Sequence, residues 1–312
     1  MRMIKRFFPL SISSILMVGC ATPPPPEAPP SKAYVLASQS YLTKDTHVLW
    51  ATHESPLRDY SLADVEYIEE SYKNAPGNAS VIFGVMSLMT GNFTGMIDIA
   101  GGTAANIAKT PHVAKQSSWV VRIPVDDAAD GMEAWRIAVD TIQENTLQLL
   151  ATKGITPSKI VLNEQRVATF GATIWQDTVY RVDPDDESTG FLYENEMYRK
   201  NGKYGLVIDE SYLINGKPTY SNSYETMLAG VYAYNGTYFK DKKIHPYDQK
   251  DGFALFMKEL TAMMPEHYFY YDAPSANNFY IPTIYQNGAQ YRFLNPNEEQ
   301  QIMTRFKARL LY

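Results

Sequence analysis

The stretch YIPTIYQNGAQYRF, residues 280–293, decides the fold class of the second half of the chain. Two runs rich in β-branched and aromatic residues flank Asn287-Gly288, a dipeptide suited to the two positive-φ positions of a type I′ turn. This turn is the tightest connection of a β-hairpin. The sequence therefore predicts a hairpin in which residues 280–285 pair with residues 290–293.

Three further Asn-Gly dipeptides, at 201, 215 and 235, extend the pattern, and the last predicts a hairpin between residues 231–234 and 237–239. Of the 23 tyrosines, 18 lie from Tyr180 onward and none lies between residues 73 and 179. Tyrosine is a good strand residue. We therefore expect a tyrosine-rich antiparallel sheet over residues 171–312.

Two helices are expected to interrupt this sheet. Apolar residues at core spacing predict one helix over residues 248–264, ended by Pro265. Asn295-Pro296, with Glu298 in the first turn, predicts the start of the last helix.

The first half, residues 33–170, mixes helices with strands. Ser61 and Asp64 form a capping-box pattern that predicts a helix ended by Pro76-Gly77. A second amphipathic helix runs through Trp135 and ends at Lys153-Gly154. Residues 119–125 and 159–162 are predicted strands. The whole chain is therefore predicted to be α+β, with two subdomains, 33–170 and 171–312.

Composition excludes several classes of protein. The chain has 312 residues with 28 bases and 34 acids, a formal charge of −6, and lacks any basic run, so nucleic acid is not expected as a partner. A single cysteine excludes an intrachain disulfide and a cysteine-rich zinc site. No cofactor is predicted. The one expected non-protein group is a covalent lipid, which the sequence of the amino terminus indicates.

The amino terminus has the layout of an export signal. Residues 1–8 carry three bases and no acid, and residues 9–18 form an apolar run that is too short for a spanning helix of about 20 residues. The sequence LMVGC, residues 16–20, resembles the lipobox of bacterial lipoproteins, although Met17 stands where that family usually has leucine. An ordinary signal peptide with an unmodified cysteine is the alternative.

The resemblance implies that residues 1–19 are removed and that Cys20 carries diacylglycerol and an N-acyl chain. Ala21, rather than aspartate, resembles the outer-membrane class of the family. The mature chain would have 293 residues and a charge of −9, because three bases are lost. Residues 20–32 form a tether, whose six prolines over residues 22–31 favour polyproline II and about 30 Å of reach.

Two segments raise further hypotheses. Residues 81–108 are apolar and glycine-rich, which suits a buried core segment or contact with a membrane or membrane complex. Asp183, Asp185, Glu187 and Glu194 have the spacing of oxygen ligands in a calcium-binding EF-hand loop, which this segment partly resembles. Ser188 replaces the glycine of that loop, so an acidic solvated turn is the alternative.

Tyr268, Tyr270 and Tyr271 are candidates for a surface that binds sugar or peptide, because aromatic rings with hydroxyl tips suit both ligands. The chain carries none of the common hydrolase, phosphate-loop or dinucleotide motifs. We therefore expect a periplasm-facing outer-membrane lipoprotein that binds an envelope protein or glycan without catalysis. One alternative is an envelope glycan or peptide hydrolase that uses carboxylates such as Asp209 or Glu210, and another is a structural role through residues 81–108.

Overall fold

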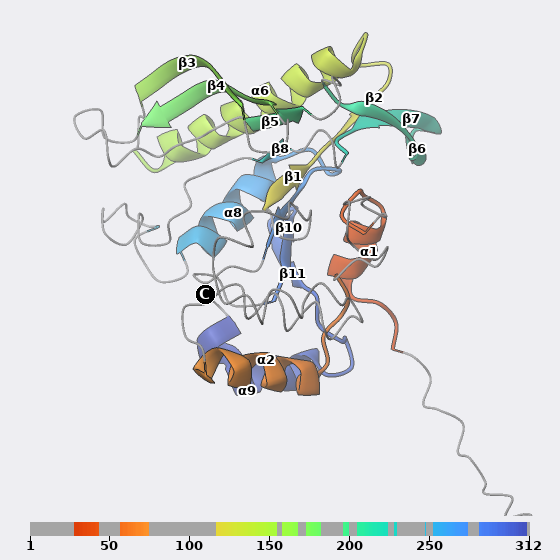
Figure 1. Ribbon diagram of the computed structural model, residues 1–312, viewed down its shortest axis with the longest axis vertical. Coiled ribbons are helices and arrows are strands. Elements are labelled where there is room, and N and C mark those ends of the chain that lie inside the picture. The colour runs from red at the N-terminus through yellow and green to blue at the C-terminus, as the bar shows by residue number, and fades with distance from the viewer. Residues whose placement is uncertain are drawn as a thin grey trace, which may run out of the picture.

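The computed structural model describes most of the folded body (Figure 1). The described residues are 28–43, 57–74, 117–154, 158–167, 173–181, 196–199, 205–223, 228–229, 247, 252–273 and 281–310. The predicted hairpin at 231–239, the segment 81–108, the loop 183–194 and the amino-terminal signal lie outside these residues.

The architecture is α+β, as the sequence predicts, because antiparallel sheets are packed by helices. An eight-stranded sheet has the order β11-β10-β9-β1-β8-β5-β4-β3. Its strands, in chain order, are β1 (Ser118–Val120), β3 (Ser158–Val167), β4 (Thr173–Arg181), β5 (Glu196–Arg199), β8 (Leu228–Ala229), β9 (Phe269–Asp272), β10 (Thr283–Gln286) and β11 (Ala289–Arg292). A three-stranded sheet, β2-β7-β6, consists of β2 (Arg122–Pro124), β7 (Lys217–Ser221) and β6 (Val207–Ile214).

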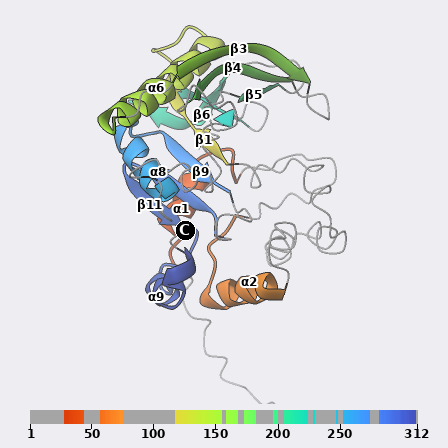
Figure 2. The ribbon, with the colours of Figure 1, turned by 90° about the vertical axis from the view of Figure 1, so that its left-hand side faces the viewer.

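Of the described helices, two cover one face of the large sheet and three pack on the other. α6 (Gly131–Thr152) and α8 (Gly252–Met263) share a core with Trp119, Tyr270 and Tyr285. α1 (Lys32–Ser38), α2 (Leu62–Asn74) and α9 (Glu299–Leu310) enclose a second core with Val120 and Phe269. Figure 2 shows α2 and α9 side by side at one end of the molecule and β3–β5 at the other. Among the described helices, none has the length and apolarity needed to cross a bilayer.

The local predictions are largely confirmed. β10 and β11 pair across Asn287-Gly288 with φ of 50° and 76°, and β6 and β7 are joined by Asn215-Gly216 with φ of 53° and 77°. Positive φ at both central residues identifies the turn type predicted from the sequence. α6 ends before Lys153, and Gly154 has φ of 76°, as a helix C-terminus of this kind requires.

Several element boundaries differ from expectation. The strand predicted over 119–125 is two strands, because the chain leaves one sheet at Val121 and enters the other. Asn222 satisfies the backbone there: its Oδ1 accepts from the Val121 amide at 3.1 Å and its Nδ2 donates to the Trp119 carbonyl at 2.6 Å. The last helix begins at Glu299 rather than at Pro296. Strands from both sides of residue 170 share the eight-stranded sheet, since β1 pairs with β9 (Trp119↔Tyr270).

Candidate functional site

The chain enters the folded body at Ser31. Pro29 and Pro30 are exposed, whereas Ser31 is 6% exposed and caps α1. Its Oγ accepts a hydrogen bond from the Tyr34 amide at 3.0 Å, which is the standard role of an N-cap serine. The proline-rich segment therefore passes directly into a capped helix whose Ala33 and Leu36 are buried.

Asp59 holds this entry point from the neighbouring segment. Its two carboxylate oxygens accept from the Ser31 amide at 2.6 Å and from the Ser31 hydroxyl at 2.5 Å. Burial raises the pKa of Asp59, although the two hydrogen bonds from Ser31 oppose that shift. Both donors are 28 positions from Asp59 in the chain, so this contact exists only in the folded body.

The other end of α1 is held by the three-stranded sheet. Arg122, the first residue of β2, donates from Nη2 to the Gln39 carbonyl at 2.7 Å. A cation at this position satisfies a free carbonyl at the helix C-terminus. The Arg122 guanidinium stacks on the Tyr212 ring, 3.7 Å from its centroid, and is almost fully buried at 1% exposure. Burial lowers the pKa of Arg122.

A third contact joins this segment to the central strand. The Tyr41 hydroxyl forms a buried hydrogen bond of 2.6 Å with Ser118 Oγ on β1. We call the set Ser31, Asp59, Tyr41, Ser118 and Arg122 the anchor seat. It attaches α1 and the residues that flank it to β1 and β2.

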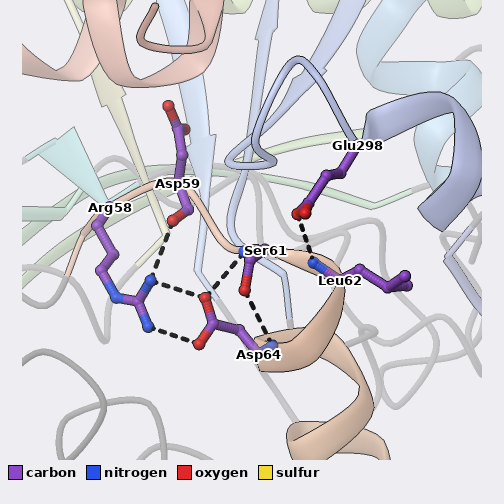
Figure 3. Close-up of polar contacts among 6 residues, drawn as sticks. All are labelled: Arg58, Asp59, Ser61, Leu62, Asp64 and Glu298. Carbon is purple, nitrogen blue, oxygen red and sulfur yellow. Dashed lines mark hydrogen bonds and ion pairs between the residues drawn. The ribbon is translucent and has the colours of Figure 1, made fainter. Parts of the chain in front are cut away.

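Next to the anchor seat, the start of α2 is capped from three directions (Figure 3). The Ser61 amide donates to Asp64 at 2.8 Å and the Asp64 amide donates to Ser61 Oγ at 3.2 Å, which confirms the predicted capping box. Glu298, before α9, accepts from the Leu62 amide at 2.8 Å. Glu298 was expected in the first turn of its own helix, but it caps α2 instead, because helix α9 starts one residue later.

Arg58 forms a bidentate ion pair with Asp64 at the start of α2. Its Nη1 and Nη2 atoms lie 2.8 and 2.9 Å from the two carboxylate oxygens of Asp64. Burial opposes ionisation of Asp64, but the hydrogen bonds from Arg58 and Ser61 outweigh it and lower the pKa of Asp64. A second ion pair, between Arg305 and Glu66, joins α9 to α2.

The Asp64 contacts predict a specific pH dependence. A carboxyl whose pKa is lowered in the folded state contributes stability above its unfolded pKa of about 3.9, and this is lost as pH falls through the lowered value. We expect Asp64→Asn to cost about 1–2 kcal/mol at pH 7 and clearly less at pH 2.5. Thermal melts at both pH values measure this difference, with the exposed Asp140→Asn as the matched control. An equal cost at both pH values would contradict it.

The sequence-predicted ligand residues occupy different places. Tyr268 and Tyr270 are 1% exposed and face α6 and α8, whereas Tyr271 is 0% exposed and lies in the core on the opposite face. The three rings therefore do not line one ligand surface, because successive strand residues alternate between faces and helices cover both. Asp209 and Glu210 are adjacent on β6, and the Asp209 carboxylate binds the Ser211 amide and hydroxyl.

Other candidates lie outside the part of the chain that the structure describes. These are Cys20 and the calcium candidates Asp183, Asp185, Glu187 and Glu194. Among the described residues, no group of three or more potential ligands could hold a metal ion.

Arg122 and Asp59 were not singled out from the sequence. A lone charge within the apolar run 119–125 was the available signal for Arg122, whereas Asp59 has no local pattern that marks it.

No family model matches this chain, and the searches of curated proteins and of solved structures find no match. The anchor seat is therefore interpreted from its own chemistry and from its position after the tether.

Proposed function

We propose that this protein is a lipid-anchored component of the bacterial outer membrane that faces the periplasm and binds an envelope protein or glycan without catalysing a reaction. The observation that carries the proposal is the position of the only cysteine, at the end of an export signal and within a sequence that resembles a lipobox. A second observation agrees with it. The body starts at Ser31, eleven residues after Cys20, and is attached to the central strands by the anchor seat.

The physical argument concerns orientation. The ten residues between Cys20 and Ser31, six of which are prolines, would reach about 30 Å as polyproline II, which would hold the body clear of the bilayer. Acyl chains contribute about 0.8 kcal/mol for each buried methylene, so several chains hold the protein on the membrane permanently. Because the proline-rich segment leads into a capped helix that is hydrogen-bonded to the body, the attachment point of the proposed anchor is a fixed part of the fold.

The test compares the wild type with Cys20→Ser. We expect intact mass to show removal of residues 1–19 and addition of acyl chains in the wild type alone, and fractionation to find only the wild type in the outer membrane. Ala21→Asp is the matched control: it should keep the lipid but change the membrane in which the protein is found. An unmodified wild type, or two forms that fractionate alike, would refute anchoring.

A second experiment distinguishes a binding protein from a hydrolase. The soluble Cys20→Ser chain is offered purified envelope glycan and a detergent extract of envelope proteins. A ligand that is retained with unchanged mass supports a binding role. Release of smaller glycan or peptide fragments would instead make the protein a hydrolase.

A further inference from the structure

Two exposed aliphatic side chains mark one face of the small sheet. In the described part of the chain, three large hydrophobic side chains are more than half exposed. Two of them, Ile208 at 57% and Leu213 at 54%, lie on β6, and the third is Tyr67 on α2. Single exposed hydrophobic residues are ordinary, but two on one short edge strand require an explanation.

The strand register connects these side chains to the core. Ile208 pairs with Tyr220 of β7, which pairs with Ile123 of β2. Ile123 is buried at 3% exposure, Tyr220 is half-buried against the same core, and Ile208 is exposed. Apolar side chains therefore continue from beneath α6 outward across the sheet to its edge.

A register shift between Asp209 and Ile214 brings Leu213 to this face. Glu210 and Ser211 are both exposed, although they are neighbours in the strand. After Ser211, the side chains that point to each face of the sheet are therefore offset by one residue from those before it. Tyr212 stacks on Arg122 at the opposite face, which places its neighbour Leu213 on the face of Ile208. We call Ile123, Tyr220, Ile208 and Leu213 the apolar strip. In Figure 1, β2 lies near one end of α6, and β7 and β6 extend to the right beyond it.

The surroundings of the apolar strip are acidic. The start of α6 lies beside the strand, because the Leu206 amide donates to the Gly131 carbonyl at 2.8 Å. The acids of the 125–130 turn and the first turn of α6 are Asp126, Asp127, Asp130 and Glu133. Glu210 lies on the same face of β6 as Ile208, whereas Asp209 lies on the opposite face with Tyr212. The exposed bases of the same region are Lys217, which is paired with Asp126 at 2.5 Å, and Arg136. Without Asp209, the net charge is thus 2 − 5 = −3.

We propose that the apolar strip docks a basic amphipathic helix of another protein, which would lie beside α6 and extend the helical layer over β7 and β6. The proposal rests on the proposed binding function and names its surface and its partner. A docked helix would cover the exposed aliphatic residues with its apolar face and meet the surrounding acids with its cations. A membrane surface fits less well, because anionic headgroups are repelled by these acids. A second copy of the chain would bring the same negative charge.

A docked strand fits less well than a helix. Strand addition needs a regular edge of free backbone groups. The register shift in β6 interrupts that edge, and the Asp209 carboxylate already accepts from the Ser211 amide at 2.9 Å. The side-chain face of the sheet, rather than its backbone edge, is therefore the surface that a partner would use.

The test measures binding of a labelled helical peptide of about 18 leucine and lysine residues, with one apolar stripe, to the full chain carrying Cys20→Ser. Fluorescence anisotropy at physiological ionic strength reports the affinity. We expect Ile208→Ser with Leu213→Ser to weaken binding about tenfold or more at unchanged net charge. Tyr67→Ser, which removes the third exposed hydrophobic residue, is the matched control and should bind as the parent chain does. A peptide with glutamate in place of lysine should bind at least tenfold more weakly.

Equal binding by the parent chain and the double variant would overturn the proposal, as would equal binding of the two peptides. Sedimentation of the parent chain alone tests whether a second copy of the chain occupies the apolar strip. A dimer that disappears in the double variant would assign the strip to a second copy and overturn the proposal. Near-ultraviolet circular dichroism confirms that the double variant is folded. If the peptide does not bind but the Cys20→Ser chain still retains envelope components, only the proposal for the apolar strip is refuted. If the wild type is not anchored, or no envelope component is retained, the proposed function itself is refuted.

Discussion

Arg122→Ala should lower the free energy of unfolding by about 3 kcal/mol. The substitution removes a side chain that is 99% buried and that stacks on Tyr212. It also leaves the Gln39 carbonyl at the end of α1 without its donor. Losing the packing of a buried side chain and losing a hydrogen bond to the helix terminus both destabilise the folded state.

Urea unfolding of the Cys20→Ser chain measures this change. Arg136→Ala is the matched control, because Arg136 is exposed on α6 and its loss should cost less than about 0.5 kcal/mol. Arg122→Lys should fall between the two, since lysine keeps the charge but not the planar group that stacks on tyrosine. If Arg122→Ala and Arg136→Ala unfold at the same urea concentration, Arg122 does not hold α1 as described.

The second large effect is expected from Gly131→Ala, at the first position of α6. Alanine normally stabilises a helix relative to glycine by about 1 kcal/mol. Here a Cβ atom would lie 2.0 Å from the Leu206 carbonyl oxygen. That oxygen belongs to the backbone, and the Leu206 amide is bonded to the Gly131 carbonyl, so neither group can turn aside. We expect a loss of about 2–3 kcal/mol, the cost of overpacking.

Gly154→Ala is the control that distinguishes the steric clash at Gly131 from the effect of replacing any glycine by alanine. Gly154 has φ of 76° and no atom within 4 Å of an added Cβ, so backbone strain alone should cost about 1 kcal/mol. The same urea measurements compare the two variants. A Gly131→Ala chain that is as stable as the wild type, or more stable, would show that the start of α6 and residue 206 are not in contact.

The anchor seat and the apolar strip meet at β2. Arg122 points toward α1 on one face, and the next residue, Ile123, points toward α6 and begins the apolar strip on the other. This arrangement follows from the alternation of side chains along a strand. A partner docked on the strip would therefore be placed on the face of β2 that is opposite the attachment of the tether.

Local features were predictable because their determinants are close in sequence. The turn at Asn287-Gly288 depends on two residues that accept positive φ. The capping box of Ser61 and Asp64 depends on residues three positions apart. The end of α6 at Gly154 depends on one glycine. The α+β class followed from these elements together with the distribution of tyrosine.

The candidate site was less predictable. Alternation along residues 268–271 indicated two faces, but only the packing of α6 and α8 on one and α1 on the other buries all three candidate tyrosines. The anchor proposal still rests on residues 1–20 and stays a prediction. The surface proposed for a partner depends on a register shift within β6 that no local pattern in the sequence indicated.

The amino-acid sequence by itself determined the Asn-Gly turns of the described hairpins, the capping box of α2 and the end of α6. Tertiary structure alone decided that Asp59 holds Ser31, that Glu298 caps α2 from 236 positions away, and that Arg122 closes α1. The physical reason is the range of the interactions. Turns and caps are stabilised by groups within a few positions of each other, whereas a buried ion or a distant cap is stable only when the fold brings its partner to it.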